Sequence, residues 1–157
     1  MAEYQSVLET LDADFEEFRR RVRVRVRRAV RETFGEGTGG AAFYIIEVLL
    51  NRGSLSPSDL AATLEVRTST MTVHLDRLEE LRWAKREPAS PGTNRILVAV
   101  TTAGRTAFER YAQVRRSVLA DVLAPLAPSQ VATLAQGLHT WVEAQRAPRS
   151  AAPEVCP

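Results

Sequence analysis

An apolar stripe that repeats every three or four residues dominates the first part of the chain. Neither glycine nor proline interrupts it between Ala2 and Phe34. This spacing places the apolar side chains on one face of an α-helix, so the sequence predicts a single long helix here. A helix of this length with a continuous apolar face needs a partner to cover it. The stripe consists of Tyr4, Leu8, Leu11, Phe15, Phe18, Val22, Val26, Val30 and Phe34.

Within this helix, residues 19–28 read RRRVRVRVRR, which alternates like a half-buried β-strand when viewed alone. Val22 and Val26 nevertheless fall on the helical stripe, whereas Val24 falls roughly opposite, so we interpret the alternation as local coincidence. Six acidic and no basic residues occupy positions 1–18, and eight arginines with no acidic residue follow at positions 19–31. The arginines fit a solvated face or pairing with the acidic half of a neighbouring helix, and contact with DNA phosphates is the alternative.

The composition fits one globular domain in a reducing compartment. At 157 residues and 45% hydrophobic, the chain is long enough to bury a core. Its one cysteine, Cys156, excludes an internal disulfide. No apolar run reaches the roughly 18 residues of a membrane span, and the acidic start lacks the apolar core of a signal peptide. We therefore expect a cytoplasmic protein with no membrane contact.

The rest of the chain predicts helices around one β-hairpin. Ser56 followed by Pro57 is typical of a helix start. Residues 83–87 and 95–100 are strand-like and enclose a turn rich in proline and glycine. The predicted fold class is mostly α with a small β-hairpin wing. Further helices are expected over AAFYIIEVLL, LSPSDLAATLE, RTSTMTVHLDRLEEL, TTAGRTAFERYAQVRRSVLADVL and VATLAQGLHTWVEAQ.

Helix, turn, helix and hairpin, in that order, form a winged helix-turn-helix. Ala61 is small, where the helix over LSPSDLAATLE must approach the next one closely, and the LEVR turn between them is short. The following helix opens with RTST, a hydroxyl-rich segment that suits base edges in the major groove. The same segment would also serve as an ordinary helix cap. The prediction of a recognition helix therefore depends on the helix before this segment and the hairpin after it.

Three stretches of the chain resemble the MarR family of transcriptional regulators. They are SLSPSDLAATLEVRTSTMTVHLDRLEELRWAKRE, RILVAVTTAGRTAFER and LAPLAPSQVATLAQGL. The resemblance covers about residues 38–143, and LDRLE and VTTAG are its most specific parts. It implies a two-fold homodimer in which the N-terminal helix and the last two helices interlock. The implied division is an N-terminal dimerisation helix (1–37), a winged helix-turn-helix (38–101), C-terminal dimerisation helices (102–147) and a disordered tail (148–157).

The resemblance implies a repressor that binds double-stranded DNA at a pseudo-palindromic operator. We expect base contacts from the first turns of the recognition helix, at Thr68, Ser69, Thr72 and Val73. Contacts with the DNA backbone or through the wing are expected from Arg67, Thr70, Arg77, Arg82, Lys85, Arg86, Asn94 and Arg95. The expected dimer interface comprises Leu8, Leu11, Phe15, Phe18, Val22, Leu134, Leu138 and Trp141.

The chain departs from the family pattern in the wing. The family usually has glycine where this chain has Arg82, and its D.R motif at the wing tip matches Gly92 and Asn94 here. Arg95, one residue along, is the nearest substitute for the family's wing arginine. This departure supports the alternative function, a winged helix that contacts protein and binds no DNA. The hydroxyl-rich recognition helix argues against that alternative, as do the basic residues Arg77, Arg82, Lys85, Arg86 and Arg95.

An enzyme is not expected. His74, His139 and Cys156 form neither a triad nor a metal-ligand spacing, and no glycine-rich loop follows a strand, so we expect no metal and no cofactor. An unidentified small-molecule effector is a further partner that the resemblance suggests. Its pocket would lie between the helical scaffold and the winged region, near residues for which ordinary core packing is the simpler interpretation: Phe43, Tyr44, Trp83 and Tyr111.

Overall fold

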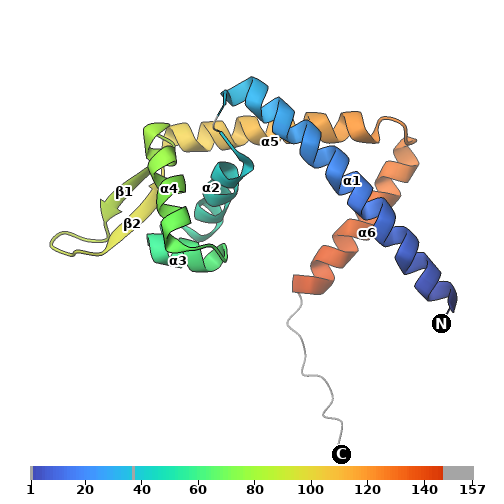
Figure 1. Ribbon diagram of the computed structural model, residues 1–157, viewed down its shortest axis with the longest axis horizontal. Coiled ribbons are helices and arrows are strands. Elements are labelled where there is room, and N and C mark those ends of the chain that lie inside the picture. The colour runs from blue at the N-terminus through green and yellow to red at the C-terminus, as the bar shows by residue number, and fades with distance from the viewer. Residues whose placement is uncertain (1, 37, 147–157) are drawn as a thin grey trace, which may run out of the picture. The chain divides into compact units, whose positions relative to one another are not determined.

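The computed structural model of the chain describes residues 2–36 and 38–146. It divides into two compact units, residues 1–119 and 120–157. The division falls inside one helix and does not test the four-part organisation expected from the sequence. The elements, labelled in Figure 1, are α1 (Ala2–Phe34), α2 (Gly40–Arg52), α3 (Pro57–Thr63), α4 (Thr68–Glu80), β1 (Ala84–Pro88), β2 (Ile96–Val100), α5 (Thr102–Leu123) and α6 (Pro128–Arg146).

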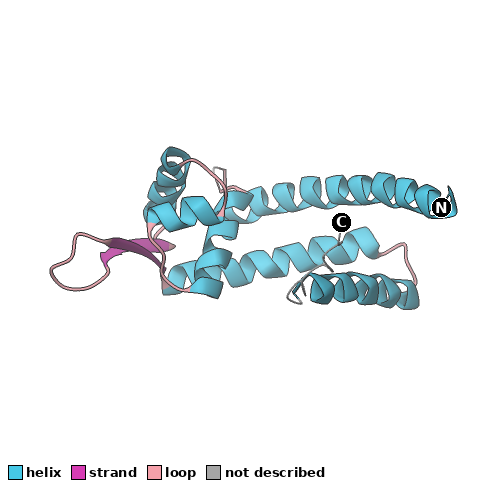
Figure 2. Ribbon diagram, turned by 90° about the horizontal axis from the view of Figure 1, so that it is seen from below, coloured by secondary structure: helices cyan, strands magenta, loops and turns pink. Residues whose placement is uncertain are grey.

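The predicted fold class is confirmed: the described residues are mostly helical and contain one two-stranded antiparallel sheet. Figure 2 shows this hairpin as the one magenta element among the helices. The strands pair in register from Ala84 opposite Val100 to Pro88 opposite Ile96. Leu55, just before α3, adds a bridge to Val98 and so ties the hairpin to the start of the helix-turn-helix.

The start of α3 follows the sequence prediction. The Ser56 hydroxyl accepts a hydrogen bond from the Asp59 backbone N–H at 3.1 Å and donates to the Asp59 carboxylate at 2.6 Å. Pro57 occupies the first turn, where its missing N–H is not needed. Ala61 is buried, and its small side chain lets α3 approach α4 closely.

The core gathers one face of α2, α3 and α4 together with the hairpin. Phe43, Ile46, Leu60, Leu78 and Val98 are completely buried. Burying an apolar side chain of this size contributes about 1.5–3 kcal/mol relative to leaving it exposed. Met71, Leu75 and Leu78 fix one face of α4 in this core, so the opposite face of α4 is held rigidly towards solvent.

The VTTAG segment joins the hairpin to α5. The Thr101 hydroxyl donates to the Arg82 carbonyl at 2.6 Å and accepts from the Gly104 backbone N–H at 3.0 Å. The Thr101 backbone N–H donates to the Trp83 carbonyl at 3.0 Å. A Cβ at Gly104 would lie 2.1 Å from that carbonyl oxygen, so the close approach requires glycine.

The long N-terminal helix is confirmed with the bounds that its stripe predicts, Ala2–Phe34. Its apolar face is covered towards the C-terminal end, where Val30 is buried and Phe34 packs on the core. Towards the N-terminal end the same face is open, with Leu11 60% and Phe15 51% exposed. One helix therefore carries both a packed and an uncovered apolar segment.

The last helix, α6, begins at Pro128, three residues before the first apolar position of the predicted segment. Proline is tolerated in a first helical turn, so it starts this helix and does not exclude it. The expected tail, including Cys156, lies outside the described residues. In the part of the chain that the structure describes, no helix is long and apolar enough to cross a membrane.

Candidate nucleic-acid interface

The face of α4 that points away from the core carries short polar side chains and one apolar one. Thr68, Ser69, Thr70 and Thr72 are all exposed. Val73 is 67% exposed, although it lies on a helix whose other apolar residues are buried. The first two turns of α4 therefore offer hydroxyl donors and acceptors beside methyl groups, which is the chemistry that base edges in a major groove require.

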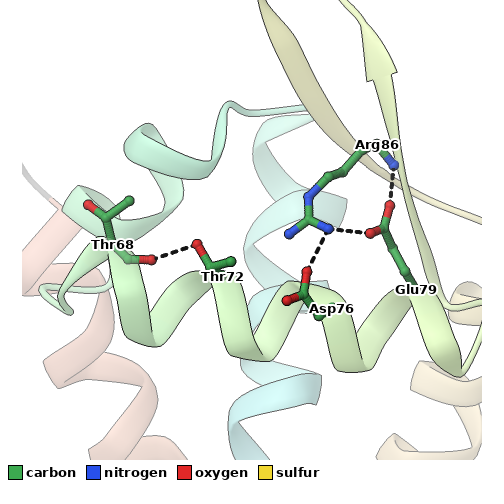
Figure 3. Close-up of polar contacts among 5 residues, drawn as sticks. All are labelled: Thr68, Thr72, Asp76, Glu79 and Arg86. Atoms are coloured by element: carbon green, nitrogen blue, oxygen red, sulfur yellow. Dashed lines mark hydrogen bonds and ion pairs between the residues drawn. The ribbon is translucent and has the colours of Figure 1, made fainter.

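The hydroxyl of Thr72 has one local partner. Its Oγ1 donates to the carbonyl of Thr68 at 3.0 Å, one turn earlier (Figure 3). This bond fixes the side-chain rotamer and leaves the oxygen lone pairs to accept a further hydrogen bond. Arg67 is the N-cap residue and makes no side-chain capping bond.

Arg86 on β1 reaches across to α4, as Figure 3 shows. Its guanidinium donates to Asp76 at 2.8 Å and forms a second, closer ion pair with Glu79. Its backbone N–H donates to the other carboxylate oxygen of Glu79 at 2.9 Å. Burial lowers the pKa of Arg86, but the bond to Asp76 and the charge of Glu79 outweigh this effect and hold the pKa above its ordinary value.

These contacts join the wing to the recognition helix, because Arg86 belongs to the hairpin and both carboxylates belong to α4. The sequence analysis expected Arg86 at a DNA phosphate and did not single out Asp76 or Glu79. Their three-residue spacing places them on one side of α4, but only the fold shows that this side faces β1. The Arg86 side chain is 27% exposed, and its guanidinium already has two carboxylate acceptors.

The other cations expected at the DNA backbone are more accessible. Arg77 pairs with Glu80 at 2.8 Å, Lys85 pairs with Glu87 at 2.5 Å, and Arg95 lies 3.6 Å from the Asp59 carboxylate. Such exposed pairs contribute only about 0–1 kcal/mol, so a phosphate could replace the carboxylate partner at little cost. Arg67, Arg82 and Asn94 are also exposed. These residues are therefore more accessible than Arg86, whose side chain two carboxylates of α4 hold.

Residues expected at the dimer interface lie on two helices, each of which exposes apolar side chains. On α1, Leu8 is 38% exposed, and Phe18 and Val22 are partly buried. On α6, Leu138 is 49% and Trp141 62% exposed, and Leu134 is similar. No group of three or more potential metal-binding side chains occurs within residues 2–36 and 38–146.

Comparison with known proteins identifies this arrangement. Residues 36–96 match the model of the MarR family. The HTH-type transcriptional regulator PecS of Dickeya dadantii is 28% identical over 114 residues, which cover 70% of this chain and 69% of PecS. The HTH-type transcriptional repressor MdtR of Bacillus subtilis is 28% identical over 112 residues, which cover 67% of this chain and 72% of MdtR. The winged helix-turn-helix region of this chain is therefore similar to the MarR family.

Solved structures show the same MarR-family fold. Wild-type MarR from E. coli in its apo form superimposes with a TM-score of 0.67 at 21% identity and covers 83% of this chain and 95% of its own. RV1404 from Mycobacterium tuberculosis superimposes with a TM-score of 0.72 at 22% identity and covers 87% of this chain and 92% of its own. The match extends beyond the winged helix-turn-helix to most of the described helices.

The departures from the MarR-family pattern now have a structural basis. Arg82, where the family usually has glycine, adopts a left-handed backbone with φ of 58°. That conformation is the reason glycine suits the position, because it costs other residues about 1–2 kcal/mol. At the wing tip, Gly92 adopts φ of 81° and Asn94 is exposed, so neither supplies the cation of the family motif.

Proposed function

We propose that this chain is a transcriptional regulator that binds double-stranded DNA with α4 in the major groove. One observation carries the proposal. The exposed face of α4 combines a row of hydroxyls with Val73, an apolar side chain that is 67% exposed and that nothing in the described part of the chain covers. A thymine methyl is a suitable partner for such a group.

We propose further that the regulator acts in the cytoplasm as a homodimer, and as a repressor, on a pseudo-palindromic operator. The uncovered apolar residues of α1 and α6 support a second copy as the partner. A two-fold dimer would present two copies of α4, and a two-fold protein matches a two-fold operator. The names of PecS, a transcriptional regulator, and MdtR, a transcriptional repressor, support the regulatory role.

The proposed contacts fall into two groups with different consequences. Thr68, Ser69, Thr72 and Val73 would contact base edges and so select the sequence. Arg77, Lys85 and Arg95 would contact phosphates, which carry the same charge in every sequence and so add affinity without selectivity. The exposed groups at Arg67, Thr70, Arg82 and Asn94 would add to the second set. We assign Arg86 to positioning of the wing.

The test is selection of bound genomic fragments by the full-length protein, followed by titration of the selected operator and of random duplex. Ser69→Ala and Thr72→Ala should each reduce the ratio of operator to random affinity by an amount equivalent to about 1–3 kcal/mol. Thr133→Ala, an exposed threonine on α6, is the matched control and should leave the ratio unchanged. An unchanged ratio in the α4 variants would contradict base reading by this helix.

The salt dependence of binding tests the second group. Lys85→Gln and Arg95→Gln should each reduce the slope of log affinity against log salt by about one unit and weaken all sequences alike. Arg116→Gln, an exposed arginine on α5, serves as the control. If the wild-type protein binds no duplex even at low salt, the winged helix contacts protein instead and the proposed function is wrong.

A further inference from the structure

Val73 lies at the centre of the face that α4 turns away from the core. Successive residues of a helix are separated by about 100°, so Val73 lies about 200° from Met71, which is completely buried. Its neighbour one turn earlier on this face is Ser69, about 160° from Met71. A side chain that is apolar and 67% exposed therefore occupies the position nearest the floor of a groove that receives this face.

The first two turns of α4 lack the groups that distinguish purines best. Guanine is read by arginine or lysine, and adenine by asparagine or glutamine, through two hydrogen bonds to one base. The structure describes α4 in full, and this helix contains no lysine, asparagine or glutamine. Its one arginine, Arg77, lies in the third turn and pairs with Glu80 at 2.8 Å. Arg67 precedes the helix and contacts phosphates in the proposed function.

The carboxylates of α4 are engaged within the chain. Cytosine offers an amino donor in the major groove, and a carboxylate can accept from it. Asp76 and Glu79 hold Arg86, as Figure 3 shows, and Glu80 holds Arg77. Each carboxylate would have to release its arginine before it could accept a hydrogen bond from cytosine. A contact of this kind is therefore disfavoured as well.

The hydroxyls of this face distinguish bases poorly, because a hydroxyl can donate to one base and accept from another. Thr72 is more restricted, since its hydrogen is donated to the Thr68 carbonyl at 3.0 Å. Its oxygen can then only accept, and both adenine and cytosine offer a donor. Among the four bases, only thymine presents a methyl group in the major groove. Val73 is therefore the most selective side chain of this face.

We propose that α4 selects its operator through the C5-methyl group of a pyrimidine, which packs against Val73 in each half-site. This inference rests on the proposed function and specifies which base the helix reads. In unmodified DNA the pyrimidine is thymine. Cytosine gains the same methyl group when it is methylated at C5, so 5-methylcytosine is a second ligand of this site. Burial of one methyl-sized group changes affinity about fourfold, and two half-sites multiply this to about 10- to 20-fold.

The experiment removes one methyl group at a time from the operator obtained by fragment selection. Uracil replaces thymine at one symmetry-related pair of positions after another, which keeps the base pairing and every hydrogen-bonding group. The affinity of the full-length protein should fall about 10- to 20-fold at one such pair. Uracil at the other positions should change the affinity less than about twofold.

Val73→Ala tests which side chain contacts this methyl group. The variant should bind the thymine operator about tenfold more weakly than the wild type, and uracil at the sensitive positions should then cost less than about twofold. Val24→Ala, at a valine of α1 that is 59% exposed, is the matched control and should keep both the affinity and the uracil effect. Circular dichroism should show unchanged helicity, because alanine favours a helix more than valine does.

Methylated cytosine tests the same contact in the opposite direction. An operator with cytosine at the sensitive positions lacks the methyl group and should bind about as weakly as the uracil operator. Replacing this cytosine with 5-methylcytosine should restore about tenfold in affinity for the wild-type protein. The same replacement should change the affinity of Val73→Ala less than about twofold.

Three results would overturn the inference. The first is an operator that is still selected although no uracil pair weakens binding more than about twofold. The second is a uracil effect that persists in Val73→Ala, because another group then senses the methyl. The third is a loss of more than about fivefold with 7-deazaguanine, which lacks the N7 acceptor that an arginine reads.

Each of these results leaves the proposed function intact, because the protein still selects an operator. A protein that binds no duplex, or binds every sequence alike, would instead refute the proposed function itself. The titration of selected operator against random duplex therefore distinguishes failure of the function from failure of the methyl contact.

Discussion

The recognition helix α4 and the N-terminal helix α1 are both amphipathic, but they expose opposite kinds of residue. Met71, Leu75 and Leu78 of α4 are buried within the same chain, and what remains exposed is mostly polar. On α1 the exposed residues include large apolar ones such as Leu11 and Phe15. A polar exposed face can bind a hydrated ligand such as DNA, whereas an apolar exposed face requires a protein partner.

The comparison also distinguishes two uses of charge. On α4, Asp76 and Glu79 hold Arg86 of the hairpin, so these charges fix a tertiary contact. On α1, the ion pairs connect residues one turn apart, such as Arg19 with Glu16 and Arg28 with Glu32. Pairs within one exposed helix contribute only about 0.2–0.5 kcal/mol each. The ion pairs within α1 therefore contribute little to the stability of the protomer.

The largest expected effect comes from the buried face of α4. Leu78→Ala should lower the free energy of unfolding by about 2–5 kcal/mol, because it leaves a cavity in the core. Chemical denaturation monitored by circular dichroism measures this loss. Leu11→Ala, the same change on the exposed face of α1, should instead lower stability in a way that depends on protein concentration, as expected for a dimer contact. Equal losses of stability in both variants at all protein concentrations would contradict a dimer contact at Leu11.

The next largest effect is expected where the hairpin meets α5. Gly104→Ala places a methyl group against the Trp83 carbonyl. This overpacking should lower the free energy of unfolding by about 1–3 kcal/mol or more. Thermal unfolding provides the measurement. Gly137→Ala on α6 is the control, since open space surrounds that position and alanine favours a helix. A normal melting temperature for Gly104→Ala would show that the hairpin and α5 approach less closely.

A smaller effect is expected from the link between α4 and the wing. Arg86→Gln should lower the free energy of unfolding by about 1–2 kcal/mol, near the low end for charged hydrogen bonds because Asp76 is more than half exposed. It should reduce operator selectivity through a displaced wing, with the salt slope of DNA binding unchanged. Arg86→Lys, which keeps the charge, should recover part of both losses. A slope reduced by one unit would instead place Arg86 at a phosphate.

The smallest effect concerns the left-handed residue between α4 and β1. Arg82→Gly should raise the free energy of unfolding by about 1 kcal/mol, because it relieves the positive φ. Arg82→Ala provides the control, since it removes the same side chain and keeps the strain. Both variants should reduce the salt slope of DNA binding equally if the guanidinium contacts a phosphate. A melting temperature of Arg82→Gly below that of Arg82→Ala would contradict strain at this position.

Much of the fold could be predicted because the local signals agree with each other. The apolar stripe predicted both ends of α1, and Ser56 with Pro57 predicted the start of α3. The turn rich in proline and glycine predicted the position of the hairpin. The exposed hydroxyls of α4 were predictable from their place at its first turns. The partners of Arg86 were not, because they lie seven and ten residues away and meet it only through the packing of β1 on α4.

The sequence by itself determined which segments are helical, which face of each is apolar and where charge changes sign, since these properties depend on neighbours within a few turns. Only the tertiary structure decided which apolar faces are covered and which cations are already paired. Val30 and Leu11 belong to the same stripe, yet one is buried and the other is 60% exposed. The physical reason is that burial depends on what packs against a face, and residues distant along the chain supply that partner.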